Sequence, residues 1–213
     1  MTPTAGGGPD VATLQRVDAL VQVGVLCNEA TLQHDEGAWV HDGDAIDVAL
    51  LALGYKRGIS PFVARNDRVI RAEIPFESER RFSAVFFEHE GRSLVAMKGA
   101  LETVLPHCRT MGTAAGAVPI DDGHIEALGR TLLQDGYRVL ALAEGAVPSI
   151  PATVTEADLP PLTMLGLVGF IDPARPEART AIAKCQTAGI TVAMVTGDHP
   201  LTAFSIARDL GMS

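Results

Sequence analysis

The pattern of apolar and polar residues predicts that the chain begins with two helices. Apolar residues recur at helical spacing over 11–27, and a second run with this spacing begins at Asp44. The side chain of Asp44 is a suitable N-cap, Asp47 stands three residues later, and Gly58 follows the expected end of the helix. Each helix is therefore expected to bury one apolar face.

The pattern then changes to that of short strands. Residues 69–74, 82–87 and 93–97 have the composition of strands, and the Glu-Gly pair at 90–91 suits a tight turn. Strands joined by tight turns pair antiparallel, so we expect an α+β domain in which helices flank an antiparallel sheet. The other elements expected here are a helix over 101–108, a loop over 110–123, a helix over 125–134 and a strand over 138–143.

Beyond residue 161, apolar runs and helical segments alternate, as they do in a βαβ unit. The continuous apolar run over 162–171 is typical of a strand buried on both faces, and 190–195 is a second such run. This order predicts a parallel sheet with a helix between its strands. The change of pattern predicts a domain boundary near residue 162, and the Gly-rich segment 1–10 is interpreted as a flexible lead-in.

The two helices of this second part have recognisable ends. Asp172 followed by Pro173 is expected to begin the first helix, and Gly189 is expected to end it. Asp198 is expected to cap the last helix, which should stop before Gly211. Polar residues thus stand where each buried strand gives way to a helix.

The composition is that of an ordinary globular protein. Hydrophobic residues make up 47% of the 213 residues and charged residues 20%. A net charge of −9 argues against nucleic-acid binding, so a phosphate-bearing ligand must meet a local basic cluster. No apolar run approaches the roughly 18 residues that span a bilayer. Cys27, Cys108 and Cys185 are far apart without a CxxC pair, which indicates reduced thiols and no metal site.

Two segments near the expected antiparallel sheet could bind a nucleotide. Lys98 follows a strand, and the adjacent Gly99 would let a phosphate approach closely; the alternative is an exposed lysine at a strand end. Phe76 stands close to Arg80 and Arg81, so the ring could stack on a nucleobase while the cations face phosphates. The alternative is a polar loop with Phe76 turned into the core.

Three further segments have both a chemical and a structural interpretation. Arg138 could be a second phosphate contact or a solvated residue at a strand edge. The segments 172–175 and 196–200 each follow a predicted parallel strand, where α/β sheets place their ligands. Thr196 could bond a phosphoryl oxygen beside helix N–H groups, whereas the aspartates of both segments could serve only as caps.

Taken in order, these segments resemble those of the P-type ATPases, in the branch that includes the calcium and sodium/potassium pumps. The matching segments are Leu26–Ala30, Gly43–Leu50, Phe76–Arg81, Lys98–Ala100, Arg138–Ala143, Asp172–Arg175 and Met194–Asp198. Each is a weak signal alone, but their joint order is specific. The resemblance implies a nucleotide-binding (N) domain over 11–162 and a partial phosphorylation (P) domain over 163–213, with the HAD-like α/β fold.

The resemblance also implies an ATP site in the first domain. Phe76 would stack on adenine, and Asp47 would lie near the adenine amino group. Lys98 would line the adenine and phosphate side of the pocket, with Gly99 giving it room. The residues implied to contact the rest of the nucleotide are Arg81 and Arg138 at the phosphates and Leu140 at the nucleoside.

In the second domain, the resemblance implies residues that serve phosphoryl transfer. Those expected to border the phosphorylation site are Thr196, Gly197 and Asp198, and those expected at the interdomain hinge are Asp172 and Arg175. The family's Asp-Lys-Thr-Gly-Thr and Gly-Asp-Gly motifs do not occur in this chain. The chain is therefore expected to bind ATP without hydrolysing it. Its implied partners are the remaining phosphorylation, actuator and transmembrane domains, with Mg²⁺ acting in the intact enzyme at the cytoplasmic face of a membrane.

Some positions depart from the family's pattern, and two other functions remain open. Arg81 stands where many relatives have Lys, and Asp44 and Asp47 stand where Glu is common. A phosphatase of the haloacid dehalogenase class would need a nucleophilic Asp after a first strand, for which the chain offers no convincing candidate. A regulatory docking module would bind a partner protein and show no dependence on nucleotide.

Overall fold

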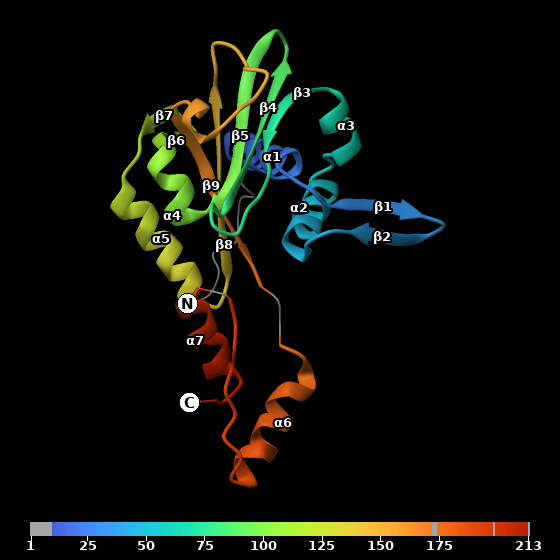
Figure 1. Cartoon of the computed structure of the whole chain (residues 1–213), viewed down its shortest axis with the longest axis vertical. Helices are drawn as coiled ribbons and strands as arrows, with labels where there is room; N and C mark the ends of the chain where they lie inside the picture. Colours follow the sequence, from blue (N-terminus) through green and yellow to red (C-terminus); the bar gives the residue numbers. More distant parts are fainter. Residues whose placement is uncertain (1–9, 172–173, 198, 213) are drawn as a thin grey trace. The chain divides into compact units, whose positions relative to one another are not determined.

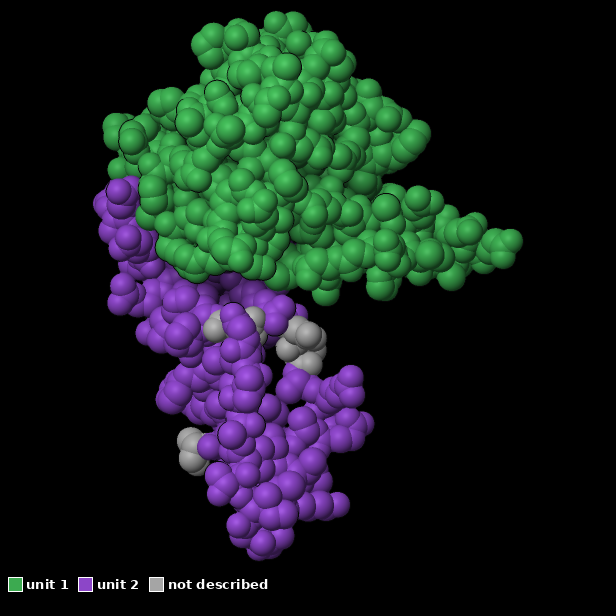
Figure 2. Space-filling model, in the orientation of Figure 1, with its two compact units in different colours: residues 1–120, 141–166 green, residues 121–140, 167–213 purple. Residues whose placement is uncertain are grey.

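The computed structural model describes residues 10–171, 174–197 and 199–212. They form two compact units, each built from more than one stretch of the chain. Unit 1 comprises Met1–Ile120 and Ala141–Gly166, and unit 2 comprises Asp121–Leu140 and Leu167–Ser213 (Figure 2). The chain therefore passes between the units after residues 120, 140 and 166. The domain boundary near residue 162 remains a prediction.

A seven-stranded sheet in the order β3-β4-β5-β8-β9-β6-β7 forms the centre of unit 1, although the start of β8 and the end of β9 are assigned to unit 2 (Figure 1). Its strands are β3 Val69–Ile74, β4 Phe82–His89, β5 Arg92–Ala100, β6 Cys108–Thr113, β7 Gly116–Pro119, β8 Arg138–Ala146 and β9 Leu162–Phe170. The pairs β3–β4, β4–β5 and β6–β7 are antiparallel, whereas β6 and β9 are parallel. The sheet is therefore mixed, where the sequence predicted a purely antiparallel one, and the α+β class is confirmed.

The hairpin between β4 and β5 confirms the turn predicted at 90–91. Glu90 and Gly91 both have positive φ angles, 49° and 71°, as a two-residue hairpin turn requires. The ladder beyond this turn pairs His89 with Arg92 and continues to Phe82 opposite Gly99. Because this register is fixed at the turn, it determines which residues of the two strands face each other at the far end.

Three helices of unit 1 enclose an apolar cluster. They are α1 Val11–Leu26, α2 Ala45–Lys56 and α3 Pro61–Asn66. The two predicted helices are confirmed, and the carboxylate of Asp44 caps α2 by accepting a bond of 2.9 Å from the N–H of Ile46. Buried side chains from all three helices meet Leu32 of the following segment in one cluster, namely Val21, Val25, Leu32, Leu51 and Ala64. This packing fixes the start of α2 beside the end of α1.

A two-stranded hairpin, which the sequence did not predict, follows α1. It consists of β1 Thr31–Asp35 and β2 Ala38–Asp42, and it extends away from the sheet of unit 1 (Figure 1). All of its residues except Leu32 are exposed, so the hairpin lacks the alternation of apolar and polar residues that marks a half-buried strand.

Two predictions in the next segment are wrong. The expected loop over 110–123 contains β6 and β7, because Thr110 pairs with Thr163 of β9 and their hydroxyl oxygens lie 2.9 Å apart. This pairing is made with a distant part of the chain, so the local composition gives no sign of it. The expected helix over 101–108 is α4 Leu101–Val104 followed by a 3-10 turn, Leu105–His107. Pro106 cannot donate the next helical hydrogen bond, so the α-helix ends before it.

Unit 2 is largely helical among the residues that the structure describes. Its helices are α5 Asp122–Gln134, α6 Pro176–Thr187 and α7 Pro200–Asp209. The hydroxyl of Thr202, which is buried on α7, donates a bond of 2.9 Å to the carbonyl of Tyr137. The helix predicted over 125–134 is confirmed, as are the stops at Gly189 and Gly211, whose φ angles are 73° and 75°. In the described part of the chain, no helix is long and apolar enough to cross a bilayer.

The predicted βαβ unit is corrected at several points. The strand β9 is confirmed, but only Leu162 and Met164 are buried along it, so it is not buried on both faces. Residues 190–195 form no strand, and Val195 is 97% exposed. A strand needs a neighbour to satisfy its N–H and C=O groups, and none of the described strands pairs with this segment. The parallel sheet predicted for this part is therefore not formed.

The predicted starts of the last two helices are also corrected. The helix expected from Asp172 begins at Pro176, with Arg175 as its N-cap residue. The last helix begins at Pro200, and the ring nitrogen Nδ1 of His199 accepts a bond of 3.2 Å from the N–H of Leu201. Proline at the first helical position thus decides both starts. Residues 172, 173 and 198 lie outside the described residues.

Candidate functional site

A buried ion pair joins the central sheet to the first turn of α2. Lys98 lies on β5 opposite Ser83 and is only 6% exposed. Its Nζ donates to Oδ1 of Asp47, whose side chain is also largely buried. A buried ammonium group is stable only beside a compensating charge, so Lys98 and Asp47 depend on each other. The alternative of an exposed lysine at a strand end is therefore wrong.

The segment after α1 completes the hydrogen bonds of Asp47. The backbone N–H of Glu29 donates to Oδ2 of Asp47 at 3.1 Å. The side-chain amide of Asn28 donates to the carbonyl of Asp47 at 2.9 Å and to that of Gly24 at 3.2 Å. Both carboxylate oxygens of Asp47 are therefore engaged by the protein. No role was predicted for Asn28 or Glu29, although they lie in the matching segment Leu26–Ala30.

The ring of Phe76 faces solvent beside this network. Phe76 is 52% exposed, so the alternative in which it turns into the core is wrong. Its backbone N–H donates to Oε1 of Glu29 at 3.1 Å. Glu29 therefore connects Phe76 to Asp47, and through Asp47 to Lys98. An exposed aromatic ring and a buried cation thus share one hydrogen-bonded network.

Arg81 and Gly99 meet where β4 begins and β5 ends. Arg81 has a φ of 55°, and its carbonyl accepts a bond of 3.0 Å from the N–H of Ala100. A Cβ on Gly99 would stand 2.6 Å from this carbonyl oxygen and from Cβ of Phe82. The backbone contact alone thus explains the glycine, and room for a nucleotide stays a prediction. The guanidinium of Arg81 is half-exposed and pairs with Glu102 at 2.8 Å.

Arg80 holds the segment that carries Phe76. Its Nη2 lies 2.8 Å from Oε1 of Glu77 and donates to the carbonyl of Pro75 at 3.4 Å. The guanidinium lies 5.7 Å from the ring centroid of Phe82. Arg80 thus contacts the protein on several sides, whereas Arg81 extends toward solvent. Of the two adjacent arginines, Arg81 is therefore the one available to a ligand.

A cysteine lies beneath the ion pair. Cys27 is buried, and its thiol donates to the carbonyl of Ala96 at 3.0 Å. Burial raises the pKa of Cys27 to about 12, and the nearby ammonium of Lys98 opposes the rise only in part. The thiol is therefore uncharged at neutral pH, and Lys98 keeps its single carboxylate partner.

The remaining predicted residues belong to unit 2 or lie outside the described residues. Arg138 is exposed and Leu140 is half-buried, and both precede the boundary after residue 140. Arg175, Thr196 and Gly197 are exposed on unit 2. Asp172 and Asp198 lie outside the residues that the structure describes. The network in unit 1 thus gathers Asp47, Phe76 and Lys98, and the roles of the other residues remain predictions.

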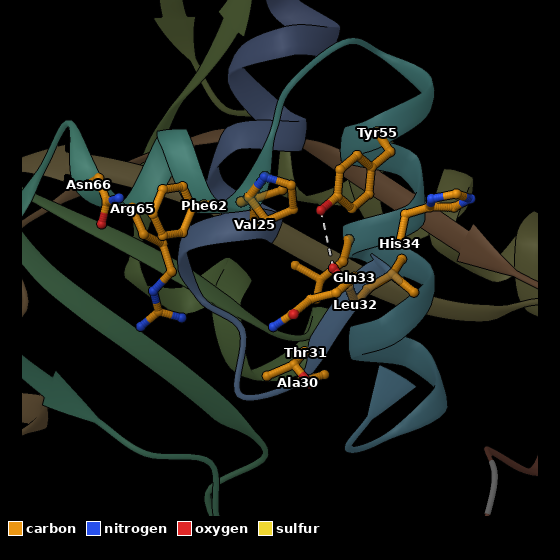
Figure 3. Close-up of a pocket in the computed structure, with 12 residues that line it drawn as sticks. Val25, Ala30, Thr31, Leu32, Gln33, His34, Tyr55, Phe62, Arg65 and Asn66 are labelled. Atoms are coloured by element: carbon orange, nitrogen blue, oxygen red, sulfur yellow. Dashed lines mark hydrogen bonds between the residues drawn. The ribbon is translucent and has the colours of Figure 1, made fainter. Parts of the chain in front are cut away.

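A separate pocket of about 780 Å³ lies between the β1–β2 hairpin, α2 and α3 (Figure 3). Tyr55 contributes its ring, and its hydroxyl donates to the carbonyl of Leu32 at 3.1 Å. Phe62 and Arg65 extend from α3 on the other side. None of the predicted site residues is among the described residues that line it. No cluster of three metal-ligating side chains occurs in the described ranges.

Comparison with known proteins identifies the family. The family model described as "P-type ATPase, cytoplasmic domain N" matches residues 16–177. The chain belongs to the P-type ATPases. The matched residues of this P-type ATPase chain include the whole network from Glu29 to Lys98, together with Arg138 and Leu140.

Curated relatives of this P-type ATPase chain are cation transporters. It is 38% identical over 192 residues to the cation-transporting ATPase pma1 of Synechocystis, covering 89% of this chain and 21% of the relative. It is 38% identical to the calcium-transporting ATPase of Bacillus subtilis, over 88% of this chain and 22% of the relative. It is 35% identical to the probable cation-transporting ATPase F of Mycobacterium tuberculosis, over 97% of this chain and 24% of the relative. The chain thus spans less than a quarter of these relatives.

Proposed function

We propose that this chain binds ATP within a cation-transporting P-type ATPase and positions it for phosphoryl transfer to an aspartate outside this chain. The observation that carries the proposal is the network of Phe76, Glu29, Asp47 and Lys98. Phe76 offers an exposed ring, which stabilises a stacked base. Lys98 adds an ammonium group whose charge is balanced by Asp47. We therefore assign the base to this network and the phosphates to the cations around it.

The cations around the network suit the phosphates. Arg81 is half-exposed and paired with Glu102 at 2.8 Å, and an exposed pair of this kind is weak. A phosphate group can therefore replace Glu102 at little cost, and we assign Arg81 to the phosphates. Arg138 is proposed as a second phosphate contact and Leu140 as a contact of the nucleoside, with Asp47 and Gly99 beside Lys98.

The second domain is proposed to serve the transfer step. Thr196, Gly197 and Asp198 would border the phosphorylation site of a HAD-like domain, and Asp172 and Arg175 would couple the two domains. Mg²⁺ would neutralise phosphate charge in the intact enzyme. Phosphoryl transfer depends mainly on positioning and charge neutralisation, so a domain that delivers the γ-phosphate contributes directly to the rate. The other pump domains would be its partners at the cytoplasmic face of a membrane.

Calorimetric titration with ATP tests this proposal. We expect saturable binding in the high micromolar to millimolar range, or about −4 to −5.5 kcal/mol, with and without Mg²⁺. We expect no phosphate release over hours in a colorimetric assay, because the acceptor Asp motif does not occur in the chain. Absence of heat at several millimolar ATP, in a chain that unfolds cooperatively, would contradict the proposal. Steady phosphate release would favour a phosphatase instead.

A further inference from the structure

The pocket between the β1–β2 hairpin, α2 and α3 is a second hollow of unit 1, apart from the network around Lys98 (Figure 3). Its volume of about 780 Å³ is within the range of small-molecule sites. The hydroxyl of Tyr55 donates to the carbonyl of Leu32 at 3.1 Å, which ties α2 to the hairpin. Leu32 and Leu51 line the pocket and also belong to the apolar cluster of the helices. The pocket is therefore built into the packing of unit 1.

Much of the pocket lining is apolar or aromatic. Val25, Leu32 and Leu51 contribute aliphatic side chains, and α2 contributes the ring of Tyr55. Phe62 of α3 also lines the pocket, although it is 73% exposed. A planar ring packed against Tyr55 and Phe62 would remove this apolar surface from water and allow ring contacts. The lining therefore favours a ligand that carries an aromatic ring.

Arg65 adds a positive charge to this lining. None of the described residues that line the pocket has a carboxylate, and Arg65 is the one lysine or arginine among them. Its Nη1 donates to the carbonyl of Asn28 at 2.7 Å, and its Nη2 lies 3.3 Å from Oε1 of Glu73. The side chains of Arg65 and Glu73 are 38% and 47% exposed, so this ion pair is weak. An anionic group can therefore replace Glu73 at Nη2 at little cost.

We propose that this pocket is a second ligand site, which takes a small organic anion made of an aromatic ring and a carboxylate. The ring packs against Tyr55 and Phe62, and the carboxylate accepts a charge-assisted hydrogen bond from Nη2 of Arg65. One guanidinium balances one negative charge, so the pocket suits a monoanion better than a nucleotide triphosphate. The site thus differs from the proposed ATP site in place and in chemistry.

Trp39 provides a direct readout of this site. It is the single tryptophan of the chain. Its ring centroid lies 4.9 Å from that of Tyr55 and 5.2 Å from that of His34, and both of these residues line the pocket. A ligand in the pocket therefore changes the surroundings of Trp39 and its fluorescence. The probe is phenylacetate, compared at constant ionic strength with phenethyl alcohol, which has the ring without the charge, and with acetate, which has the charge without the ring.

We expect phenylacetate to bind the 213-residue chain saturably in the millimolar range, as is usual for so small a ligand. Phenethyl alcohol and acetate should each bind about tenfold more weakly. Arg65→Gln should weaken phenylacetate about tenfold and leave phenethyl alcohol unchanged, whereas Phe62→Ala should weaken both. The matched control is Arg71→Gln, which removes an arginine paired with Glu88 outside the pocket and should change neither affinity.

Three results would overturn the proposal. They are a lack of saturable binding, equal binding of phenylacetate and phenethyl alcohol, and unchanged phenylacetate affinity in an Arg65→Gln chain that unfolds cooperatively. If Arg65→Gln does not fold, Phe62→Ala decides in the same way. Phe76→Ala should bind phenylacetate as the unaltered chain does. Loss of the probe in Phe76→Ala would place it in the network around Lys98, which overturns the second site and leaves the proposed ATP binding intact.

Discussion

At the residue scale, Phe76 is positioned by its backbone while its ring remains free. The N–H of Phe76 is bonded to Glu29, and the guanidinium of Arg80 donates to the carbonyl of Pro75 just before it. The ring itself is 52% exposed. Keeping a large apolar ring in water forgoes the burial that would otherwise stabilise the fold. The exposure of the ring therefore does not serve stability, and it fits the proposed stacking of a base.

Replacement of this ring should affect binding far more than folding. We expect Phe76→Ala to weaken ATP binding by about 1–3 kcal/mol, the usual value of one base–aromatic stack. The free energy of unfolding should change by less than about 0.5 kcal/mol, as is typical of exposed positions. Calorimetry and urea denaturation measure the two quantities. Phe62→Ala, at a position 73% exposed on α3, is the matched control and should leave ATP affinity unchanged.

A contrary outcome would also be informative. If Phe76→Ala binds ATP as tightly as the unaltered chain, the base does not stack on this ring.

The sequence could indicate Phe76 and Lys98 because the aromatic ring and the cation stand in recognisable segments. It could not indicate the contact of Glu29 with the backbone of Phe76, because that hydrogen bond joins residues 47 positions apart.

At the scale of elements, the pairing of β4 with β5 determines the geometry around Lys98. Phe82 lies opposite Gly99, and the carbonyl of Arg81 accepts the N–H of Ala100 at 3.0 Å. This closure at the end of the ladder brings Arg81 next to the residue that follows Lys98. A side chain at position 99 would separate the two strands at this point.

We expect Gly99→Ala to destabilise the fold by about 1–3 kcal/mol, because overpacking at a fixed backbone forces the strands apart. The added Cβ would stand 2.6 Å from the carbonyl oxygen of Arg81. Urea denaturation followed by circular dichroism measures the change. Gly112→Ala on β6 is the control. The nearest atom to its added Cβ would be the carbonyl oxygen of Met164 on β9, at 3.8 Å. Equal stability of the two variants would contradict the clash at position 99.

Some elements that are stabilised within a short stretch of the chain were predicted correctly, but the local hairpins β1–β2 and β6–β7 were not. The cap of α2 at Asp44 and the turn at 90–91 are local features, and both are confirmed. The strand β6 was missed because its pairing with β9 joins residues more than 50 positions apart. The strand predicted over 190–195 was wrong because an apolar composition alone does not form a strand. No described strand pairs with this segment.

At the scale of the whole molecule, the proposed base site and the last two helices belong to different units. Glu29, Phe76 and Lys98 all lie in unit 1, whereas α6 and α7 lie in unit 2. Within unit 2, the bond from Thr202 to Tyr137 connects α7 to the segment after α5. Removal of α7 therefore affects the packing of unit 2 first.

A chain that ends after Ile171 should still bind ATP, with a dissociation constant within about threefold of the full chain, because the residues of the network all precede the removed segment. Its melting temperature should fall, since α5 loses its contacts with α7. Calorimetry and thermal denaturation test the two statements. Loss of binding in a truncated chain that still unfolds cooperatively would place part of the base site in residues 172–213.

The strand order of the central sheet also has a consequence for synthesis of the protein. β6 and β7 are made before β8 and β9, yet these later strands lie between them and β5 in the sheet. When the chain has left the ribosome up to residue 120, β3–β4–β5 and β6–β7 are still two separate pieces with open edges. Such edges can pair with the wrong partner until β8 and β9 emerge. These edges are therefore expected to stay open during synthesis of residues 121–170.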